Sequence, residues 1–257
     1  MDHLAPSVSV VIPAHNEERT IAQVARACMD HTPGVLEVIV VDDGSTDATA
    51  QVAAAAGADV IRLERNQGKG AALQRGVDHA RGEILLFIDA DGQDDPSEIP
   101  AMLAAFEPGV DIVLGSRFVG HFRPGAITRL NYLGTRFITV CVNALFGIHV
   151  SDPLAGFRAV RASVFKQVKI QARGYDIEVD VLLRIVRMGG GVREVPAQRS
   201  ARPHGATGLS SFRDGTIILL RALQVRFARM PRPDRAAPRQ GLVAKPAVER
   251  LTRPDKR

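Results

Sequence analysis

Residues 84–96 read ILLFIDADGQDDP and place four aspartates directly after an apolar run. They are Asp89, Asp91, Asp94 and Asp95. Ionised carboxylates so close together repel one another and resist burial, so they need a cation, hydrogen-bond donors or full solvation. Asp89 and Asp91 suit a divalent metal that is completed by phosphate oxygens and water. Asp94 and Asp95 are predicted to be solvated acids at the start of the next helix, where the helix dipole favours them.

Two other kinds of site also use closely spaced aspartates. A calcium loop of the EF-hand type needs Gly at its sixth position and Glu at its twelfth, where a count from Asp89 reaches Asp94 and Pro100. Phosphatases with an aspartyl nucleophile usually follow Asp-x-Asp-Gly with Thr or Val, where this chain has Gln93. The metal site fits the residues better, and it requires a diphosphate ligand nearby.

The first half of the chain alternates β-branched apolar runs with helical segments. The runs are residues 8–14, 36–43, 58–64, 83–91 and 111–117. This pattern predicts an α/β fold with a mostly parallel sheet that is covered by helices on both faces. The polar motifs PAHNEE, DDGSTD, DADGQDD and GSR follow four of these runs. Because parallel strands end at one edge of a sheet, where ligands bind, we expect the four motifs to meet there.

Two later segments, residues 129–146 and about 213–230, predict amphipathic helices. The apolar stripe of the first consists of Leu130, Leu133, Phe137, Val140, Cys141 and Ala144, and that of the second of Leu219, Leu220, Leu223, Phe227 and Met230. Arginines lie beside both stripes. Such helices suit either an anionic membrane surface or ordinary packing on the sheet.

The composition, 46% apolar and 24% charged, suits one large domain over residues 1–230. Residues 231–257 hold five prolines, eight Lys or Arg and three acids, and are predicted to be a basic, disordered tail. Residues 1–230 hold 25 basic and 25 acidic side chains, so the net charge of +5 belongs to the tail. We therefore expect no nucleic-acid partner.

The sequence also predicts where the protein acts. Cys28 and Cys141 are too few for a disulfide framework and fit a reducing interior. No stretch approaches the roughly 18 apolar residues that span a bilayer, and the N-terminus lacks the order of a signal peptide. We expect a cytoplasmic protein that associates peripherally with the inner face of the membrane.

Seven motifs follow one another along residues 7–215: VVIPAHNEE, VVDDGSTD, NQGKGAAL, IDADGQ, GSR, DPLAGFR and RGYDIEVD. Together they resemble the family 2 glycosyltransferases of GT-A fold, and among these the polyprenyl-phosphate sugar synthases of the dolichol-phosphate mannose synthase type. The resemblance implies an inverting transfer of a hexose or N-acetylhexosamine from a GDP- or UDP-linked sugar to polyprenyl phosphate. It also implies Mg²⁺ or Mn²⁺ as the cofactor.

The resemblance assigns roles to individual residues. For binding the nucleotide sugar it implies Pro13, His15, Glu17, Asp43, Asp89, Ala90, Asp91 and Gln93. Of these, Asp89, Asp91 and Gln93 would surround the metal, and the catalytic groups would be Asp91, Arg117 and Arg202. His15 stands where Tyr is usual, which leaves the preferred base open. Gly208 stands where a Lys usually follows the Arg-x-x-Gly-x-Ser element, which leaves the phosphate clamp at Arg202 incomplete.

The acceptor decides whether a catalytic base is needed. A hydroxyl acceptor requires a carboxylate to remove its proton, whereas a phosphate monoester, with a second pKa of about 6, is already mostly dianionic at pH 7. The candidate acceptor residues are Arg117, Arg129, Asp152 and Glu178, and Asp176 and Asp180 are further candidate bases. A hydroxyl acceptor, a nucleotidyltransferase and a binding module without catalysis remain as alternatives at this point.

Overall fold

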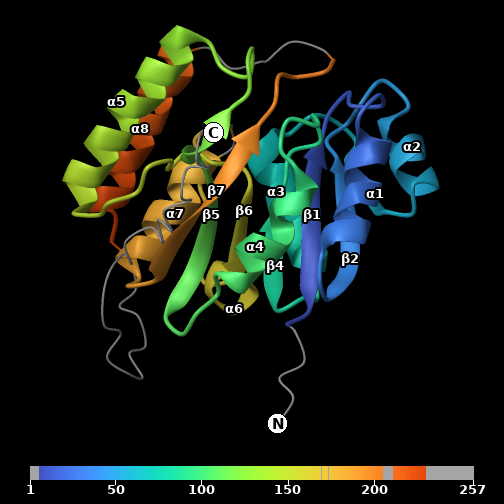
Figure 1. Ribbon diagram of the computed structural model, residues 1–257, viewed down its shortest axis with the longest axis horizontal. Helices are drawn as coiled ribbons and strands as arrows, with labels where there is room; N and C mark the ends of the chain where they lie inside the picture. Colours follow the sequence, from blue (N-terminus) through green and yellow to red (C-terminus); the bar gives the residue numbers. More distant parts are fainter. Residues whose placement is uncertain (1–5, 169, 173, 205–210, 230–257) are drawn as a thin grey trace, which may run out of the picture.

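A seven-stranded sheet forms the centre of the protein in the computed structural model, which describes residues 6–168, 170–172, 174–204 and 211–229 (Figure 1). The strands lie in the order β3-β2-β1-β4-β6-β5-β7. Their bounds are β1 Val8–Ala14, β2 Val35–Asp42, β3 Asp59–Arg62, β4 Ile84–Phe87, β5 Val110–Phe122, β6 Arg158–Arg161 and β7 Gly191–Arg199. Among these strands β6 alone runs antiparallel to its neighbours, β4 and β5. The prediction of a mostly parallel α/β sheet is confirmed.

Helices cover both faces of the sheet because the strand side chains alternate between two apolar cores. On β1, Val11 enters one core with α3, α5, α7 and α8, whereas Val10 and Ile12 enter the other with α1, α2 and α4. The helix bounds are α1 Ile21–His31, α2 Thr49–Ala55, α3 Lys69–His79, α4 Ile99–Ala104, α5 Arg129–Phe146, α6 Ala162–Phe165, α7 Ile177–Arg187 and α8 Ser211–Phe227. A short 3-10 turn, η1 (Pro96–Glu98), precedes α4.

Most of the predicted segments form the expected elements. The runs at 8–14, 36–43 and 111–117 lie in β1, β2 and β5, although β5 continues to Phe122. The helix predicted at 129–146 is α5, and the one predicted near 213–230 is α8, which ends at Phe227. The sequence did not reveal β6, α6, α7 or β7. The predicted tail, 231–257, lies outside the described residues, so the division at residue 230 stays a prediction.

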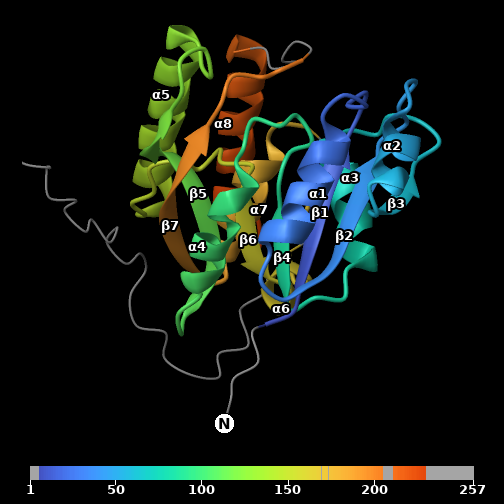
Figure 2. The same cartoon turned by 45° about the vertical axis from the view of Figure 1, so that its right-hand side comes forward.

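The helices α5 and α8 stand side by side at the β5–β7 end of the sheet (Figures 1 and 2). The inner side of this helix pair packs against the core. Its buried residues are Ile138 and Val142 of α5 and Ile218, Ala222 and Val225 of α8. Among the helices of the described residues, none is long and apolar enough to cross a membrane.

Two helical glycines make a matched test of this packing. A Cβ on Gly76 of α3 would clash with Val11 Cγ1 and lie 3.1 Å from Val41 Cγ2, whereas a Cβ on Gly134 of α5 would meet no atom within 4 Å. Gly76→Ala should therefore lower the free energy of unfolding by about 1–3 kcal/mol. Gly134→Ala should raise it by about 0.5–1 kcal/mol, because Ala favours the helix. Urea unfolding measures both, and equal effects would contradict this packing.

Candidate active site

The loops after β1 and β2 are fastened together by Asn16. Its Oδ1 accepts the backbone N–H of Thr46 at 2.9 Å, and its own backbone N–H donates to Ser45 Oγ at 2.9 Å. Asn16 has a left-handed backbone with φ of 57°, a conformation that Asn tolerates better than most residues. The motifs PAHNEE and DDGSTD thus form one wall at the carboxyl edge of the sheet.

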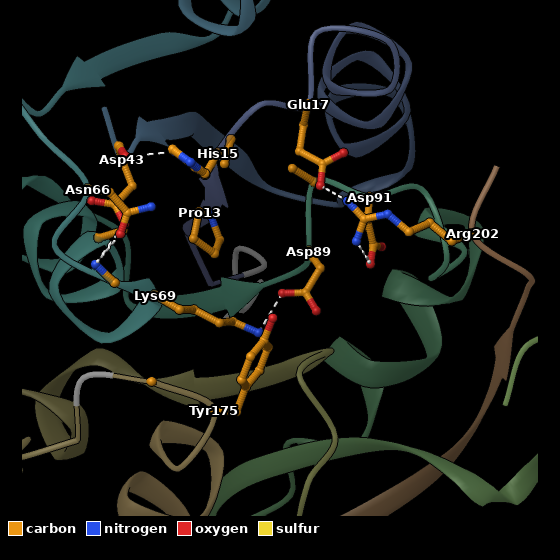
Figure 3. Close-up of a pocket in the computed structure, with 15 residues that line it drawn as sticks. Pro13, His15, Glu17, Asp43, Asn66, Lys69, Asp89, Asp91, Tyr175 and Arg202 are labelled. Atoms are coloured by element: carbon orange, nitrogen blue, oxygen red, sulfur yellow. Dashed lines mark hydrogen bonds and ion pairs between the residues drawn. The ribbon is translucent and has the colours of Figure 1, made fainter. Parts of the chain in front are cut away.

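A cavity of about 440 Å³ opens beside this wall (Figure 3). Its lining comes from the ends of β1, β2 and β4, the start of α3 and the segment before α7. Seven of the eight residues predicted to bind the nucleotide sugar line it: Pro13, His15, Glu17, Asp43, Asp89, Ala90 and Asp91. The eighth, Gln93, lines a neighbouring cavity. Arg202 reaches the first cavity from beyond β7.

Asp43 is held in place at one end of this first cavity. Its carboxylate accepts the backbone N–H groups of Gln67 at 2.7 Å and Gly68 at 2.8 Å, where α3 begins. Its carbonyl oxygen lies 2.9 Å from His15 Nδ1. Because a carbonyl can only accept, Nδ1 carries the proton of the His15 ring. Carboxylate, carbonyl and imidazole are therefore oriented before a ligand arrives.

Lys69, at the start of α3, bridges two carboxylates in the middle of the site. Its Nζ lies 2.6 Å from Asp89 Oδ1 and 2.8 Å from Glu178 Oε1. Gly156 makes room for this bridge, because a Cβ there would lie 3.1 Å from Asp89 Oδ2 and 3.3 Å from Lys69 Nζ. The DPLAGFR motif thus contributes a glycine at a position where a side chain would press against both partners of the ion pair.

The two central aspartates differ in charge environment. Burial by itself would raise the pKa of Asp89, but Lys69, Arg199 and Arg117 outweigh it and lower this pKa to about 2. Burial raises the pKa of Asp91 to about 6, and the neighbouring Asp89 carboxylate adds to the increase. Asp91 has only longer cation contacts, since Arg199 and Arg202 each lie 3.5 Å from its Oδ2.

A second cavity of about 310 Å³ adjoins the first and shares Lys69, Asp89, Asp91, Tyr175 and Arg202 with it. The second cavity has a chemically mixed lining. Charged and polar residues come from the strand ends and from the starts of α5 and α7, and they include Gln93, Arg117, Asn131, Glu178 and Arg199. Apolar residues come from β5, α8 and the loops, and they are Phe122, Ile127, Leu154 and Ile218.

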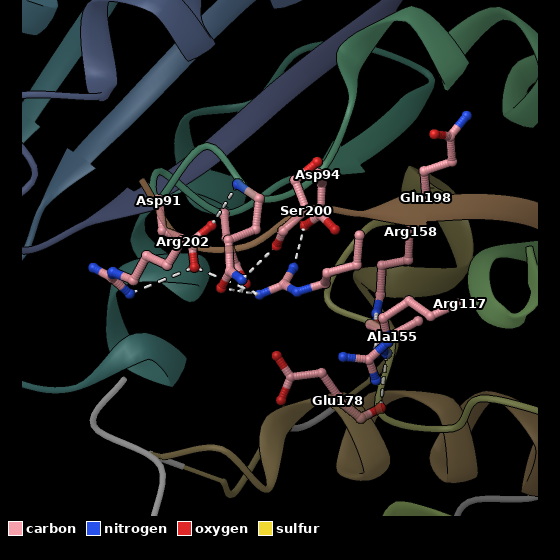
Figure 4. A network of polar contacts seen from close by, with 12 residues as sticks. Asp91, Asp94, Arg117, Ala155, Arg158, Glu178, Gln198, Ser200 and Arg202 are labelled. Atoms are coloured by element: carbon pink, nitrogen blue, oxygen red, sulfur yellow. Dashed lines mark hydrogen bonds and ion pairs between the residues drawn. The ribbon is translucent and has the colours of Figure 1, made fainter. Parts of the chain in front are cut away.

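The prediction for Asp94 is wrong. Asp94 is not solvated: it is 7% exposed, and its Oδ2 lies 2.7 Å from Arg199 Nη1. The cause is a long-range ion pair, since β7 brings Arg199 to the acidic loop. Figure 4 shows Asp94 within this network of polar contacts. Asp95 does begin η1 as expected, because its Oδ1 accepts the backbone N–H of Ser97.

Arg117 and Asp152, two of the predicted acceptor residues, bind each other. The Nε and Nη2 atoms of Arg117 lie 2.6 and 2.7 Å from the Asp152 carboxylate oxygens. Glu194 of β7 holds this loop by accepting the backbone N–H groups of Ser151 and Asp152. Arg129 begins α5 as an exposed residue and does not line either cavity.

The other predicted carboxylates also have cationic partners. Glu178 binds Lys69, Asp176 lies 2.8 Å from Arg221 Nε, and Asp180 lies 2.7 Å from Arg184 Nε. All four candidate bases from the sequence are therefore engaged in ion pairs.

Comparison with known proteins places this geometry in a family. The family model described as Glycosyl transferase family 2 matches residues 9–169. The chain belongs to the family 2 glycosyltransferases.

Named relatives and solved structures agree with this membership. The glycosyltransferase is 36% identical over 216 residues to Glycosyltransferase AglJ of Haloferax volcanii, covering 83% of this chain and 70% of the relative. It is 32% identical over 218 residues to the polyprenol monophosphomannose synthase of Mycolicibacterium smegmatis, covering 78% and 80%. The glucosyl-3-phosphoglycerate synthase of Mycobacterium tuberculosis, crystallised with Mn²⁺, UDP-glucose and phosphoglyceric acid, superposes with a TM-score of 0.70 at 27% identity, covering 88% and 81%.

The glycosyltransferase could hold the divalent metal of its structural relatives mainly through Asp91. Among the described residues, no group of three His, Cys, Asp or Glu side chains forms an all-protein metal site. Asp91 fits a hard cation that keeps open positions for phosphate and water, since its charge is poorly compensated. Asp89 is already bound to Lys69, and the Gln93 amide oxygen accepts from Arg199 at 3.0 Å. The metal roles of Asp89 and Gln93 stay predictions.

Four residues of the site were missed by the sequence reasoning. They are Lys69, Tyr175, Glu194 and Arg199. Lys69 lies in the NQGKG motif and Tyr175 in RGYDIEVD, so the motifs carried a signal for both. Nothing local distinguishes Glu194 or Arg199, because their roles depend on the position of β7.

The pKa of Asp91 gives a pH-dependent test in metal-free protein. Between pH 4 and 6 the unfolded chain ionises this side chain, whose ordinary pKa is 3.8, while the folded protein keeps it protonated up to about 6. The Asp91 contribution to the free energy of unfolding should therefore fall as pH rises through this range, by up to about 3 kcal/mol. Asp91→Asn should remove the fall, as measured by urea unfolding in EDTA.

Asp95→Asn is the control for this experiment, because Asn caps a helix as well as Asp does. It should keep the wild-type pH profile. Mg²⁺ or Mn²⁺ at pH 7 should raise the unfolding temperature of the wild type and of Asp95→Asn but not that of Asp91→Asn. A metal-induced shift of equal size in Asp91→Asn would rule out Asp91 as the ligand.

Proposed function

We propose that this glycosyltransferase moves a hexose or N-acetylhexosamine, with inversion, from a nucleotide-diphosphate sugar to polyprenyl phosphate at the cytoplasmic face of a membrane. The observation that carries the proposal is the commitment of the candidate bases to cations, beside a cavity that is lined by both arginines and apolar residues. The name of the polyprenol monophosphomannose synthase relative supports the same acceptor.

The donor would occupy the first cavity. Asp43 and His15 offer oriented acceptor groups, a carboxylate and the ring Nε2, for the base and ribose at one end. Asp89, Asp91 and Arg202 lie at the other end, where the diphosphate would sit. A divalent cation held by Asp91 would neutralise the charge that develops on the leaving diphosphate. Arg202 would add to this stabilisation, since its guanidinium can move from Glu17 and Asp91 to the phosphate oxygens.

The acceptor class follows from the four carboxylates that the sequence offers as bases, because each of them is held in an ion pair. Asp152 has both oxygens bound to Arg117, and Glu178 is bound to Lys69. A carboxylate in such an ion pair is a weak proton acceptor, because protonation would leave the cation uncompensated. A hydroxyl would need that proton transfer, whereas a dianionic phosphate can attack the sugar carbon directly. The site therefore suits a phosphate nucleophile.

The lipid part of the acceptor matches the rest of the second cavity. Phe122, Ile127, Leu154 and Ile218 give its outer part an apolar lining next to α5 and α8. A small phosphorylated acceptor would not need these contacts. A polyprenyl chain would extend along them with its phosphate beside the arginines.

The outer face of α5 and α8 would rest on the membrane. Leu133, Phe137 and Val140 of α5 are 66%, 61% and 64% exposed, and Phe227 of α8 is 78% exposed. These residues belong to the stripes that the helical periodicity identified. In α8 that stripe is divided, since Leu219 packs against the core whereas Leu220, Leu223 and Phe227 are exposed. Exposed apolar faces of this kind mark contact with a membrane or a partner, and Arg129, Arg136 and Arg226 beside them favour anionic lipid.

The first test measures nucleoside diphosphate release with Mg²⁺, polyprenyl phosphate and a panel of GDP- and UDP-linked sugars. We expect release with at least one donor, dependent on the lipid phosphate, and a loss of about 100-fold or more in Asp91→Ala, since metal stabilisation contributes several kcal/mol. Polyprenol without the phosphate serves as the hydroxyl acceptor in a parallel series. Release with that acceptor only would establish the hydroxyl alternative, and absence of turnover with every pair would overturn the proposal.

The second test concerns the membrane face. The double variant Leu133→Glu/Phe137→Glu should bind anionic vesicles at least about tenfold more weakly. Two apolar side chains that would enter the membrane are replaced by negative charges, which the anionic lipid surface repels. Leu36→Glu, an exposed leucine on β2, is the control and should bind as the wild type does. Flotation with vesicles measures both, and equal binding of all three proteins would place the membrane contact elsewhere. Deletion of 231–257 tests the predicted tail separately.

A further inference from the structure

Two arginines line the second cavity without reaching the first. Arg117 is the arginine of the GSR motif within β5, and Arg199 is the last residue of β7. The other cations of the site, Lys69 and Arg202, line both cavities. Arg117 and Arg199 are therefore the positive charges that belong to the acceptor side alone.

The sheet itself brings Arg117 and Arg199 together. The register of β5 against β7 shifts between Ser116 and His121, after which Phe122 pairs with Arg199. The guanidinium of Arg117 lies over the Phe122 ring, 5.9 Å from its centroid. The irregularity in β5 therefore places the Arg117 side chain beside Phe122, the residue that pairs with Arg199.

Each guanidinium is braced by its own carboxylate. Asp152 holds Arg117 through Nε and Nη2, and Asp94 holds Arg199 through Nη1 at 2.7 Å. The Nη2 of Arg199 also donates to Gln93 Oε1 at 3.0 Å. Within the described part of the chain, Arg117 Nη1 and Arg199 Nε make no hydrogen bond, so each fork keeps a donor for a ligand.

The two like charges repel each other across a partly buried space. Burial lowers the pKa of Arg117, the Asp152 carboxylate raises it above its ordinary value, and the charge of Arg199 works against this increase. The side chains of Arg117 and Arg199 are only 17% and 14% exposed, so water screens this repulsion weakly. An anion between them would remove the repulsion.

A purely structural role for Arg199 would account for only part of this arrangement. Asp94 needs a cation because it is buried, and one contact at 2.7 Å supplies it. An ion pair with Asp94 alone has no need for the second arm of Arg199 to line the cavity, where its Nη2 donates to Gln93 and lies 3.5 Å from Asp91 Oδ2. The planar fork of arginine matches the oxygens of a phosphate group well.

We propose that Arg199, acting with Arg117, binds the phosphate of the acceptor at the inner end of the second cavity. This inference rests on the proposed function and adds a binding residue from β7 to the site. The phosphate would lie between the two guanidinium groups, facing the sugar carbon of the donor. Asp94 and Gln93 are then positioning residues, because they orient the guanidinium of Arg199.

The test compares Arg199→Gln with Arg161→Gln in the full chain. Arg161 is a matched control, since it is a partly buried arginine of β6 at the opposite edge of the sheet, bound to the Val110 carbonyl. Arg199→Gln should raise the KM for polyprenyl phosphate about 10- to 100-fold, the loss expected for charge-assisted hydrogen bonds, and change the KM for the sugar donor less than about threefold. Arg161→Gln should change neither. Arg199→Lys should give an intermediate KM, because it keeps the charge without the fork.

A second variant guards against misfolding, because Arg199→Gln leaves Asp94 without a cation. Asp94→Asn/Arg199→Gln replaces the ion pair by a neutral pair and should show the same high acceptor KM with a wild-type unfolding temperature. A wild-type acceptor KM in this double variant, or an equal rise in donor KM, would overturn the proposal.

Inorganic phosphate separates this inference from the proposed function. Calorimetric titration of the nucleoside-diphosphate complex should detect phosphate binding in the wild type and Arg161→Gln, and about tenfold weaker binding or none in Arg199→Gln. If no polyprenyl phosphate is glycosylated but this difference holds, the function is wrong and the anion site stands. If glycosylation occurs and phosphate binds all three proteins equally, the assignment of Arg199 is wrong.

Discussion

The ammonium group of Lys69 lies between two carboxylates that come from distant parts of the chain. Asp89 lies just after the end of β4, and Glu178 lies in the first turn of α7. Without the cation, these two acids and Asp91 would face one another in a partly buried space, which is unfavourable. The bridge therefore allows the first half of the fold, with its parallel strands, to close against the second half. Both cavities share Lys69, so their common boundary depends on it.

The charges of the site form a connected network. Lys69 pairs with both Asp89 and Glu178, Arg117 pairs with Asp152, and Arg199 pairs with Asp94. Asp91 differs from these acids, since its contacts with Arg199 and Arg202 are 3.5 Å long and its pKa is raised. This difference explains how two aspartates in one short motif can serve different purposes. One supports the fold of the site, and the other keeps the capacity to bind a metal.

The second cavity connects the charged edge of the sheet with the helices at its end. Its polar part is formed at the strand ends, and its apolar part lies next to α5 and α8, whose outer faces are exposed. A family 2 glycosyltransferase can thus present a charged reaction centre and an apolar surface on the same side of a small domain. The charges are positioned by the sheet. The helix pair packs through its inner side chains only, so its outer apolar side chains stay exposed.

The sequence by itself determined the elements whose patterns are local. The apolar runs predicted β1, β2, β3, β4 and β5, the 3.6-residue periodicity predicted α5, and the family resemblance of the motifs identified seven residues that line the first cavity. These succeed because hydrophobic period and strand-end chemistry are properties of neighbouring residues. The strands β6 and β7 escaped prediction, since RAVR is short and GVREVPAQR is interrupted by charge and proline.

Only the tertiary structure decided which charges pair and which way the helix stripes point. Arg199 and Asp94 are 105 residues apart, and Arg117 and Asp152 are 35 apart, so no local pattern could reveal that these acids are neutralised. Periodicity finds the apolar face of α5 but does not say whether it meets the core or the solvent. Leu133 and Phe137 are exposed because Ile138 and Val142, on the other side of the helix, make the contacts with the core.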